Sequence, residues 1–147
     1  MSEPMYPLPS LHFEVSWGDS NNTVNFSEVS GLTLESEPIE YRGGADITLT
    51  VQKIPGLRKY GNVTMKRGIL AKENGFWDWW NTIRSGTVLR RSVTISLLNE
   101  EHKPVMTWKI ANAWPVKVEG PSLNATGNEI AIETLEFAHE GMEVQAA

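Results

Sequence analysis

Three histidines and two nearby carboxylates are the side chains of this 147-residue chain that could do chemistry. His12, His102 and His139 are scattered, and no pair has the spacing that places two ligands on one metal ion. Glu133 and Glu136 could act as an acid–base pair, but a glutamate on the polar face of a strand is far more common. The chain has no cysteine, which excludes disulfides, thiolate metal sites and cysteine nucleophiles. We therefore expect no catalytic residue, no metal ligand and no cofactor.

Two glycine-containing motifs are also incomplete. Gly120-Pro121-Ser122-Leu123 lacks the second glycine of a Gly-x-Ser-x-Gly nucleophile elbow. Gly43-Gly44 lacks the following Lys-Ser/Thr of a phosphate-binding loop. These absences favour a protein that is not an enzyme.

A basic segment at residues 53–68 could instead bind a partner. It holds five basic residues, with Ile54, Leu57 and Tyr60 between them. Such a cluster could neutralise the phosphates of a nucleic acid. However, the chain as a whole carries a net charge of −5, and the interleaved apolar residues are typical of a protein-docking loop with apolar anchors and a charged rim. We expect no specific nucleic-acid binding.

Charge is unevenly distributed along the whole chain. Residues 1–41 contain seven acidic residues and no basic one, residues 42–72 contain seven basic residues and one acidic one, and residues 110–147 contain six acidic residues and one basic one. This pattern predicts an anionic partner for the basic stretch, complementary faces that meet between copies of the chain, or simply solvated loops.

The elements that must position these residues are mostly strands, because apolar and polar residues alternate with a period of two. The predicted strands cover residues 13–17, 24–29, 32–37, 47–51, 63–66, 93–97 and 106–110. Turn-rich residues 18–22 predict a hairpin between the first two strands, and residues 99–104 predict a hairpin between the last two. The third strand should end near Pro38, which cannot donate to a ladder.

One segment, residues 73–86, has a helical period. Phe76, Trp79, Trp80 and Ile83 fall on one apolar stripe, while Trp77 lies off it. Asn74 is the expected N-cap, and Arg84 and Gly86 suit the end of the helix.

The last predicted element, residues 129–139, has its apolar residues out of phase, which indicates a bulge, a strand buried on both faces or a short helix. Residues 1–10 and 143–147 have no pattern and are predicted to be flexible tails. The fold class is therefore mainly β, with two packed antiparallel sheets in a sandwich or barrel and one flanking short helix. Residues 1–147 are expected to form one domain.

Six tryptophans allow a second interpretation, a monomeric carbohydrate-binding module that stacks exposed rings on sugars. Trp17, Trp79, Trp80 and Trp108 are in phase with apolar neighbours, which favours a place in the core.

Several ordered motifs along the chain resemble the inner tail-tube proteins of contractile phage tails and extracellular contractile injection systems, the phage T4-like tail tube family. The motifs lie between about His12 and Gly141. They comprise the basic segment 53–68, Phe76-Trp77-Asp78-Trp79-Trp80-Asn81, Asn112-Ala113-Trp114-Pro115-Val116-Lys117, Gly120-Pro121-Ser122-Leu123-Asn124 and residues 129–141.

The resemblance implies a structural role. Members of this family form six-membered rings that stack head to tail into a hollow tube, which a contracting sheath drives through a target envelope. The implied partners are other copies of the chain, the sheath, baseplate or spike and terminator proteins, and cargo or DNA in the lumen. It also implies that residues 129–141 form a strand near the lumen, and that an excursion of about residues 43–66 reaches the adjacent ring.

The contact residues predicted on this basis lie mainly in the basic segment. They are Lys53, Ile54, Pro55, Leu57, Arg58, Lys59, Tyr60, Lys66 and Trp77. Arg58, Lys59 and Lys66 are expected to meet acidic groups of another copy, and an acidic lumen is expected to repel nucleic acid.

Localisation follows from two absences in the sequence. No apolar run approaches the roughly 20 residues of a membrane-spanning helix, and no signal peptide is recognisable. We expect synthesis in the cytoplasm, followed by assembly into a particle that is released outside the cell.

Overall fold

The computed structural model describes residues 12–18, 26–45, 51–69 and 74–146, and in this part the chain is mainly β with one short helix. The elements are β1 (Phe13–Ser16), β2 (Phe26–Ser30), β3 (Leu34–Tyr41), β4 (Gln52–Tyr60), β5 (Val63–Gly68), α1 (Gly75–Trp80), β6 (Arg91–Leu98), β7 (Pro104–Glu119), β8 (Ile132–Ala138) and β9 (Gly141–Ala146). All strand pairings are antiparallel. The predicted fold class is confirmed.

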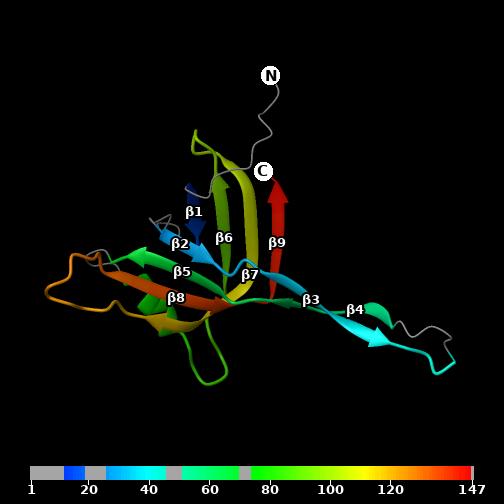
Figure 1. Cartoon of the computed structure of the whole chain (residues 1–147). Coiled ribbons are helices and arrows are strands. Elements are labelled where there is room, and N and C mark those ends of the chain that lie inside the picture. The colour runs from blue at the N-terminus through cyan, green and yellow to red at the C-terminus, as the bar shows by residue number, and fades with distance from the viewer. Residues whose placement is uncertain (1–11, 19–25, 46–50, 70–73, 147) are drawn as a thin grey trace.

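The 16-residue strand β7 connects two layers (Figure 1). Its first half pairs with β6 and β9, and β6 pairs with β1, which gives the four-stranded sheet β1-β6-β7-β9. Its second half pairs with β8, followed by β5 and β2, which gives the sheet β7-β8-β5-β2. The strands of the second sheet run across those of the first. At the bend, Asn112 has a φ of 55°, a left-handed conformation that asparagine tolerates better than most residues.

The hydrophobic core lies between these two sheets and under α1. Its fully buried members come from β1 and the residue that follows it, and from β5, α1, β6, β7 and β8. They include Val15, Trp17, Met65, Phe76, Trp79, Val93, Ile95, Ile110, Leu135 and Phe137. Leu135 and Phe137 are buried on β8, so residues 132–138 form a strand and not a helix.

Helix α1 is shorter than the sequence predicts. Asn74 occupies the N-cap position without a side-chain cap hydrogen bond, and the helix ends at Trp80. Gly86 does have a positive φ of 79°, but it lies in a tight turn between Arg84 and Thr87 and does not close the helix. Phe76 and Trp79 are buried as the stripe predicts.

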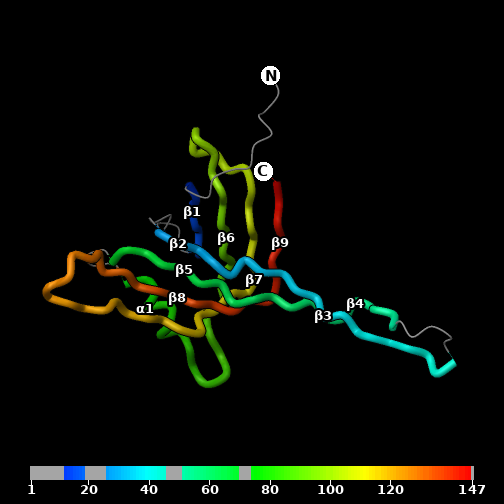
Figure 2. Tube along the Cα trace, viewed as in Figure 1, coloured from blue at the N-terminus to red at the C-terminus, as the bar shows by residue number. Residues whose placement is uncertain are grey.

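The strands β3 and β4 form a two-stranded arm that projects from the sandwich (Figures 1 and 2). The arm continues the β2–β5 pair beyond a joint at residues 31–33 and 61–62. At this joint Gly31 has a φ of 87°, and a Cβ added there would lie 2.2 Å from the carbonyl oxygen of Asn62. The joint therefore depends on glycine.

Three predictions about strand order and ends are wrong. The first two strands form no hairpin with each other, because β1 pairs with β6 and β2 with β5. Residues 143–146, predicted as a tail, belong to β9, which β7 holds in its sheet. The third strand does not end near Pro38 but continues to Tyr41.

The predicted tail at residues 1–10 and most of the predicted strand at residues 47–51 lie outside the described residues. The hairpin between β6 and β7 forms as predicted.

Candidate assembly surface

One of the two candidate acid–base residues, Glu133, is held in an ion pair with Arg67. Arg67 donates from Nε to Glu133 Oε1 over 2.6 Å, and Glu136 lies on the opposite face of β8. His139 Nε2 lies 3.1 Å from the Gly61 carbonyl oxygen. In the described part of the chain, no three His, Asp or Glu residues gather in a way that could hold a metal ion.

The arm is built around two facing prolines. Pro38 lies directly opposite Pro55, and the register shifts next to this pair. A proline has no N–H to donate, so two prolines at one irregular position cost the ladder less than two separate interruptions would. Gly56, next to Pro55, allows the two strands to approach closely here, because a Cβ at this residue would lie 2.3 Å from the Glu37 carbonyl oxygen. The first part of the basic segment, predicted to be a docking loop, is therefore the strand β4, which ends at Tyr60.

Charge on the arm is compensated within the chain. Lys59 Nζ lies 2.5 Å from Glu37 Oε1, Glu35 lies opposite Lys59, and Glu40 lies opposite Lys53. In all, β3 contributes three carboxylates and β4 three basic side chains. The charge segregation in the sequence is thus largely cancelled where these strands pair.

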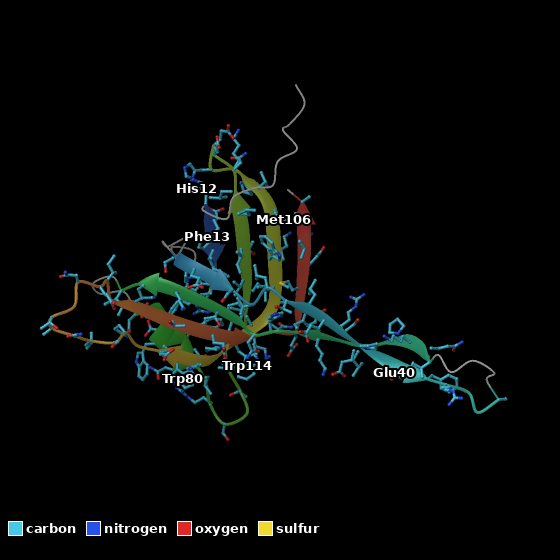
Figure 3. The ribbon with its side chains drawn as sticks, in the orientation of Figure 1. His12, Phe13, Glu40, Trp80, Met106 and Trp114 are labelled. Carbon is cyan, nitrogen blue, oxygen red and sulfur yellow. The ribbon has the colours of Figure 1, made fainter. Side chains whose placement is uncertain are left out.

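The arm also exposes apolar side chains. Ile39 and Ile54 lie directly opposite each other and are 54% and 47% exposed, and Leu57 is 80% exposed. Tyr41 shares the face of Ile39 by strand alternation and is exposed as well. Contiguous exposed apolar residues on a projecting element are typical of an interaction surface. Figure 3 shows Glu40 on the projecting arm, away from the body of the sandwich.

The structure brings seven of the nine predicted contact residues together on β4 and separates the other two. The seven are Lys53, Ile54, Pro55, Leu57, Arg58, Lys59 and Tyr60. Lys66 lies on β5, where its Nζ is 3.5 Å from Glu28 Oε2. Trp77 lies on α1 with its side chain half exposed.

Sequence reasoning missed the arm residues of β3. Ile39 and Tyr41 alternate with Glu40, which is the pattern of a strand, but Pro38 predicts that the strand ends before them. The signal that could have found them is the second proline, Pro55, at a position able to face the first.

A second surface is the four-stranded sheet β1-β6-β7-β9. In the described residues, β1 and β9 each pair on one side only. Three successive antiparallel pairings separate these two edge strands, so they run antiparallel to each other. Exposed edges of this kind are templates for pairing with another chain.

The joint of the arm packs against the end of β8. The rings of Tyr60 and His139 lie 5.3 Å apart, and burial lowers the pKa of His139, opposed by backbone hydrogen bonds at Gly61 and Gly141. A shallow hollow of about 420 Å³ lies beside this joint, between Tyr60 and residues of β6, β7 and β9 that include Met142.

The tryptophans do not form a sugar platform. Trp17 and Trp79 are fully buried, Trp80, Trp108 and Trp114 are half-buried, and only Trp77 is exposed. The position of Trp80 and Trp114 near the body of the sandwich is visible in Figure 3. One exposed ring does not support a stacking surface for carbohydrate.

None of the helical structure in the described ranges is long and apolar enough to cross a membrane.

Comparisons with known proteins agree with this architecture. A chain of the PVC sheath-tube complex in the extended state, from an extracellular contractile injection system, is 34% identical over 97% of this chain and 94% of its own, with a TM-score of 0.88. A chain of the anti-feeding prophage cap, described as the AFP tube terminating cap, is 32% identical over 100% of this chain and 96% of its own, with a TM-score of 0.89.

Hcp1 from Flavobacterium johnsoniae shows a more distant likeness of fold, with a TM-score of 0.54 and 9% identity over 92% of this chain and 95% of its own. No match was found among curated protein sequences. The family model described as T4-like virus tail tube protein gp19 matches residues 9–143. The chain therefore belongs to the T4-like tail tube protein family.

Proposed function

We propose that the chain is the subunit of the inner tube of a contractile injection apparatus, and that it closes into six-membered rings through the edges of the sheet β1-β6-β7-β9. The observation that carries this proposal is the pair of single-sided edge strands β1 and β9, which run antiparallel to each other. If β9 of one copy pairs with β1 of the next, the alternation of strand direction continues unbroken around the ring.

The size of such a ring is reasonable. Six copies of four strands give a barrel of about 24 strands, which at about 4.8 Å between strands and a typical tilt has a backbone diameter of about 45 Å. That leaves a continuous channel.

Rings then stack into a tube through the arms. Ile54, Leu57 and the facing Ile39 are the apolar anchors of this contact, with Lys53, Pro55, Arg58, Lys59 and Tyr60 beside them on β4. Since Lys59 and Lys66 already meet Glu37 and Glu28 of their own chain, apolar contacts contribute more than new ion pairs do. Trp77 contacts a further subunit or the surrounding protein.

The other partners follow from the complexes in which relatives occur. Those complexes are a sheath-tube assembly, a tube terminating cap and a baseplate. We infer the same classes of partner here: a sheath around the tube, a baseplate or spike at one end, a terminator at the other, and cargo in the lumen. The tube is a structural component without enzymatic activity, made in the cytoplasm and released in an extracellular particle. One tail tube domain spans the chain, since β7 runs through both layers.

Negative-stain electron microscopy of the purified protein tests this proposal. We expect rings, alone or stacked, around a barrel whose backbone diameter is about 45 Å. A chain that remains monomeric at every concentration, and in the presence of a baseplate that nucleates relatives, would contradict it.

A further inference from the structure

Two of the three histidines, far apart in the sequence, meet at one end of the four-stranded sheet. The ring centroids of His12 and His102 lie 4.9 Å apart, with an angle of 67° between the ring planes. His12 directly precedes the edge strand β1, and His102 lies in the turn of the β6–β7 hairpin. Figure 3 shows His12 at the end of the sheet where this hairpin turns. Spacing along the chain does not reveal the contact, because it forms only when β1 pairs with β6.

We propose that His12 and His102 together bind a divalent transition metal ion. Imidazole nitrogen is a typical ligand of zinc, nickel and copper, whereas magnesium and calcium prefer oxygen ligands. Such a site departs from the expectation, drawn from the spacing of histidines in the sequence, that the chain has no metal ligand. Both ligands belong to one chain, so the site does not depend on the rings proposed above.

The separation of the two rings suits a shared ion. A zinc-bound histidine nitrogen lies about 2.0–2.1 Å from the metal, which places the centroid of its ring about 3.2 Å from the metal. Two such rings with centroids 4.9 Å apart subtend an angle of about 100° at the ion, between about 90° for octahedral and about 109° for tetrahedral coordination. Both side chains are exposed, so each ring can turn a nitrogen toward the ion, because exposed side chains change rotamer within nanoseconds.

The backbone that carries the two ligands is held in place by hydrogen bonds. Asn99 Oδ1 accepts a hydrogen bond from the Glu101 N–H at 3.0 Å, and the His102 N–H donates to the Asn99 carbonyl oxygen at 2.9 Å. The His12 carbonyl oxygen accepts from the Leu98 N–H at 2.8 Å. Ligands on a backbone that is already fixed lose little conformational entropy when an ion binds.

His102 has a backbone conformation that favours glycine. Its φ is 59°, in the left-handed region that glycine adopts freely and that histidine and asparagine tolerate better than most residues. Residues other than glycine in this region are concentrated at functional sites. A glycine would form the turn with less strain, so the histidine is consistent with a role for its side chain.

Water completes the coordination of the ion. In the ranges that the structure describes, no three His, Asp or Glu residues gather to hold a metal, so the remaining positions stay open to solvent, as one position does in a catalytic zinc site. Glu100, Glu101 and Lys103 of the same turn are exposed, and two carboxylates against one ammonium group attract a cation. We expect weaker binding than in a structural zinc site with four protein ligands.

A bound ion ties the edge strand β1 to the hairpin. The strand has four residues and, among the described residues, pairs only with β6. An ion that binds the folded chain alone stabilises it, and here it joins the residue before β1 to the turn after β6. A further consequence rests on the proposed ring, in which β1 is one of the two pairing edges: the ion fixes the strand that a neighbouring copy must meet.

Zinc titration of untagged protein, stripped with a chelator, tests the site. A fluorescent zinc indicator in competition measures the affinity at pH 7.5 for the unmodified chain, His12→Gln, His102→Asn and the control His139→Gln, which removes the third histidine. Asparagine tolerates the positive φ at residue 102, and His102→Gly replaces it if circular dichroism shows that His102→Asn is not folded.

We expect one zinc ion per unmodified chain. His12→Gln and His102→Asn should each weaken binding by about tenfold or more, because the second imidazole of the pair binds as an intramolecular ligand, while His139→Gln should bind as the unmodified chain does. Equal affinity in all four proteins would overturn the proposal. Loss of affinity in only one of the two ligand variants would overturn it as well, since a single exposed histidine would then account for the binding.

Thermal unfolding and hydrogen exchange test the consequence for β1. Zinc should raise the Tm of the unmodified chain and slow amide exchange in residues 13–16, and it should do neither in His12→Gln. An equal rise of Tm in His12→Gln, or an equal rise with magnesium, would contradict the site. These measurements use dispersed subunits, and microscopy reports separately whether rings form, so failure of the proposed function and failure of the metal site are distinguishable.

Discussion

Arg67 and Glu133 form an ion pair at the edge of the hydrophobic core, with Nε and Oε1 2.6 Å apart. The Arg67 side chain is 1% exposed, and its guanidinium carbon lies 4.1 Å from the centroid of the Phe76 ring. The pair spans β5 and β8 at directly opposite positions, and the ring belongs to α1. One buried charge thus connects the second sheet to the helix.

Glu133→Ala should strongly destabilise the fold, because it leaves a buried guanidinium without this carboxylate. Loss of one partner of a buried ion pair costs about 3 kcal/mol or more of unfolding free energy. Urea denaturation followed by tryptophan fluorescence measures the change. Glu136→Ala, on the other face of β8, is the control and should cost under about 0.5 kcal/mol. A double variant, Arg67→Met with Glu133→Leu, should recover much of the loss, and equal effects of the two alanine variants would contradict the role of the pair.

Alternation of apolar residues was sufficient to predict most of the strands of the sandwich. Alternate residues are buried in these segments, for example Val15 and Trp17, Val63 and Met65, and Ile95. This local pattern does not depend on which strand is the partner. Strand order was not predictable in the same way. The connection between β1 and β2 looked like a hairpin, yet their partners β6 and β5 lie far along the chain.

The arm was the least predictable element, since its strands bury almost nothing and carry prolines. A strand exposed on both faces leaves no amphipathic signal, and Pro38 and Pro55 are compatible with it only because they face each other. The segregation of charge is visible in the sequence, but the compensation of these charges within the chain is not, because Glu37 and Lys59 meet only when β3 and β4 pair.

Acid should loosen the joint of the arm through His139. Burial lowers the pKa of His139 from its ordinary value of 6.5, so the unfolded chain binds this proton more readily than the folded one. The stability contributed by neutral His139 is therefore complete above about pH 6.5 and is lost as the pH falls from 6.5 through the folded-state pKa.

Urea denaturation at pH 7.5 and pH 5 measures this loss, and His139→Gln should reduce it. Between pH 7.5 and pH 8.5, where His139 is neutral in both states, the two proteins should change in parallel. An unchanged loss of stability in His139→Gln would assign the acid sensitivity to other groups.

Gly31→Ala should destabilise the chain by more than a positive φ alone explains. A Cβ at this position would lie 2.2 Å from the Asn62 carbonyl oxygen, so the joint must open in addition to the cost of about 1–2 kcal/mol for a left-handed residue. Gly86→Ala is a matched control, because Gly86 has a φ of 79° with no atom within 4 Å of an added Cβ. Thermal unfolding of both variants separates the cost of the positive φ from the cost of the close approach to Asn62. Equal losses would show that the close approach at Gly31 is relieved without cost.

Leu57→Asp combined with Ile54→Asp should abolish stacking without unfolding the subunit. Both side chains are exposed on the arm, so the core and the sheet edges stay intact, while a carboxylate buried between rings would be desolvated without a partner. Tyr60 is a poorer choice for this test, since it packs on His139 at the joint.

Leu89→Asp, the same substitution at an exposed leucine outside the arm, serves as the control and should still give tubes. Electron microscopy should then show single rings for the arm variant, with circular dichroism unchanged. Normal tubes from the arm variant would mean that the arm is not the stacking contact, and loss of rings as well as tubes would mean that it joins neighbours within a ring.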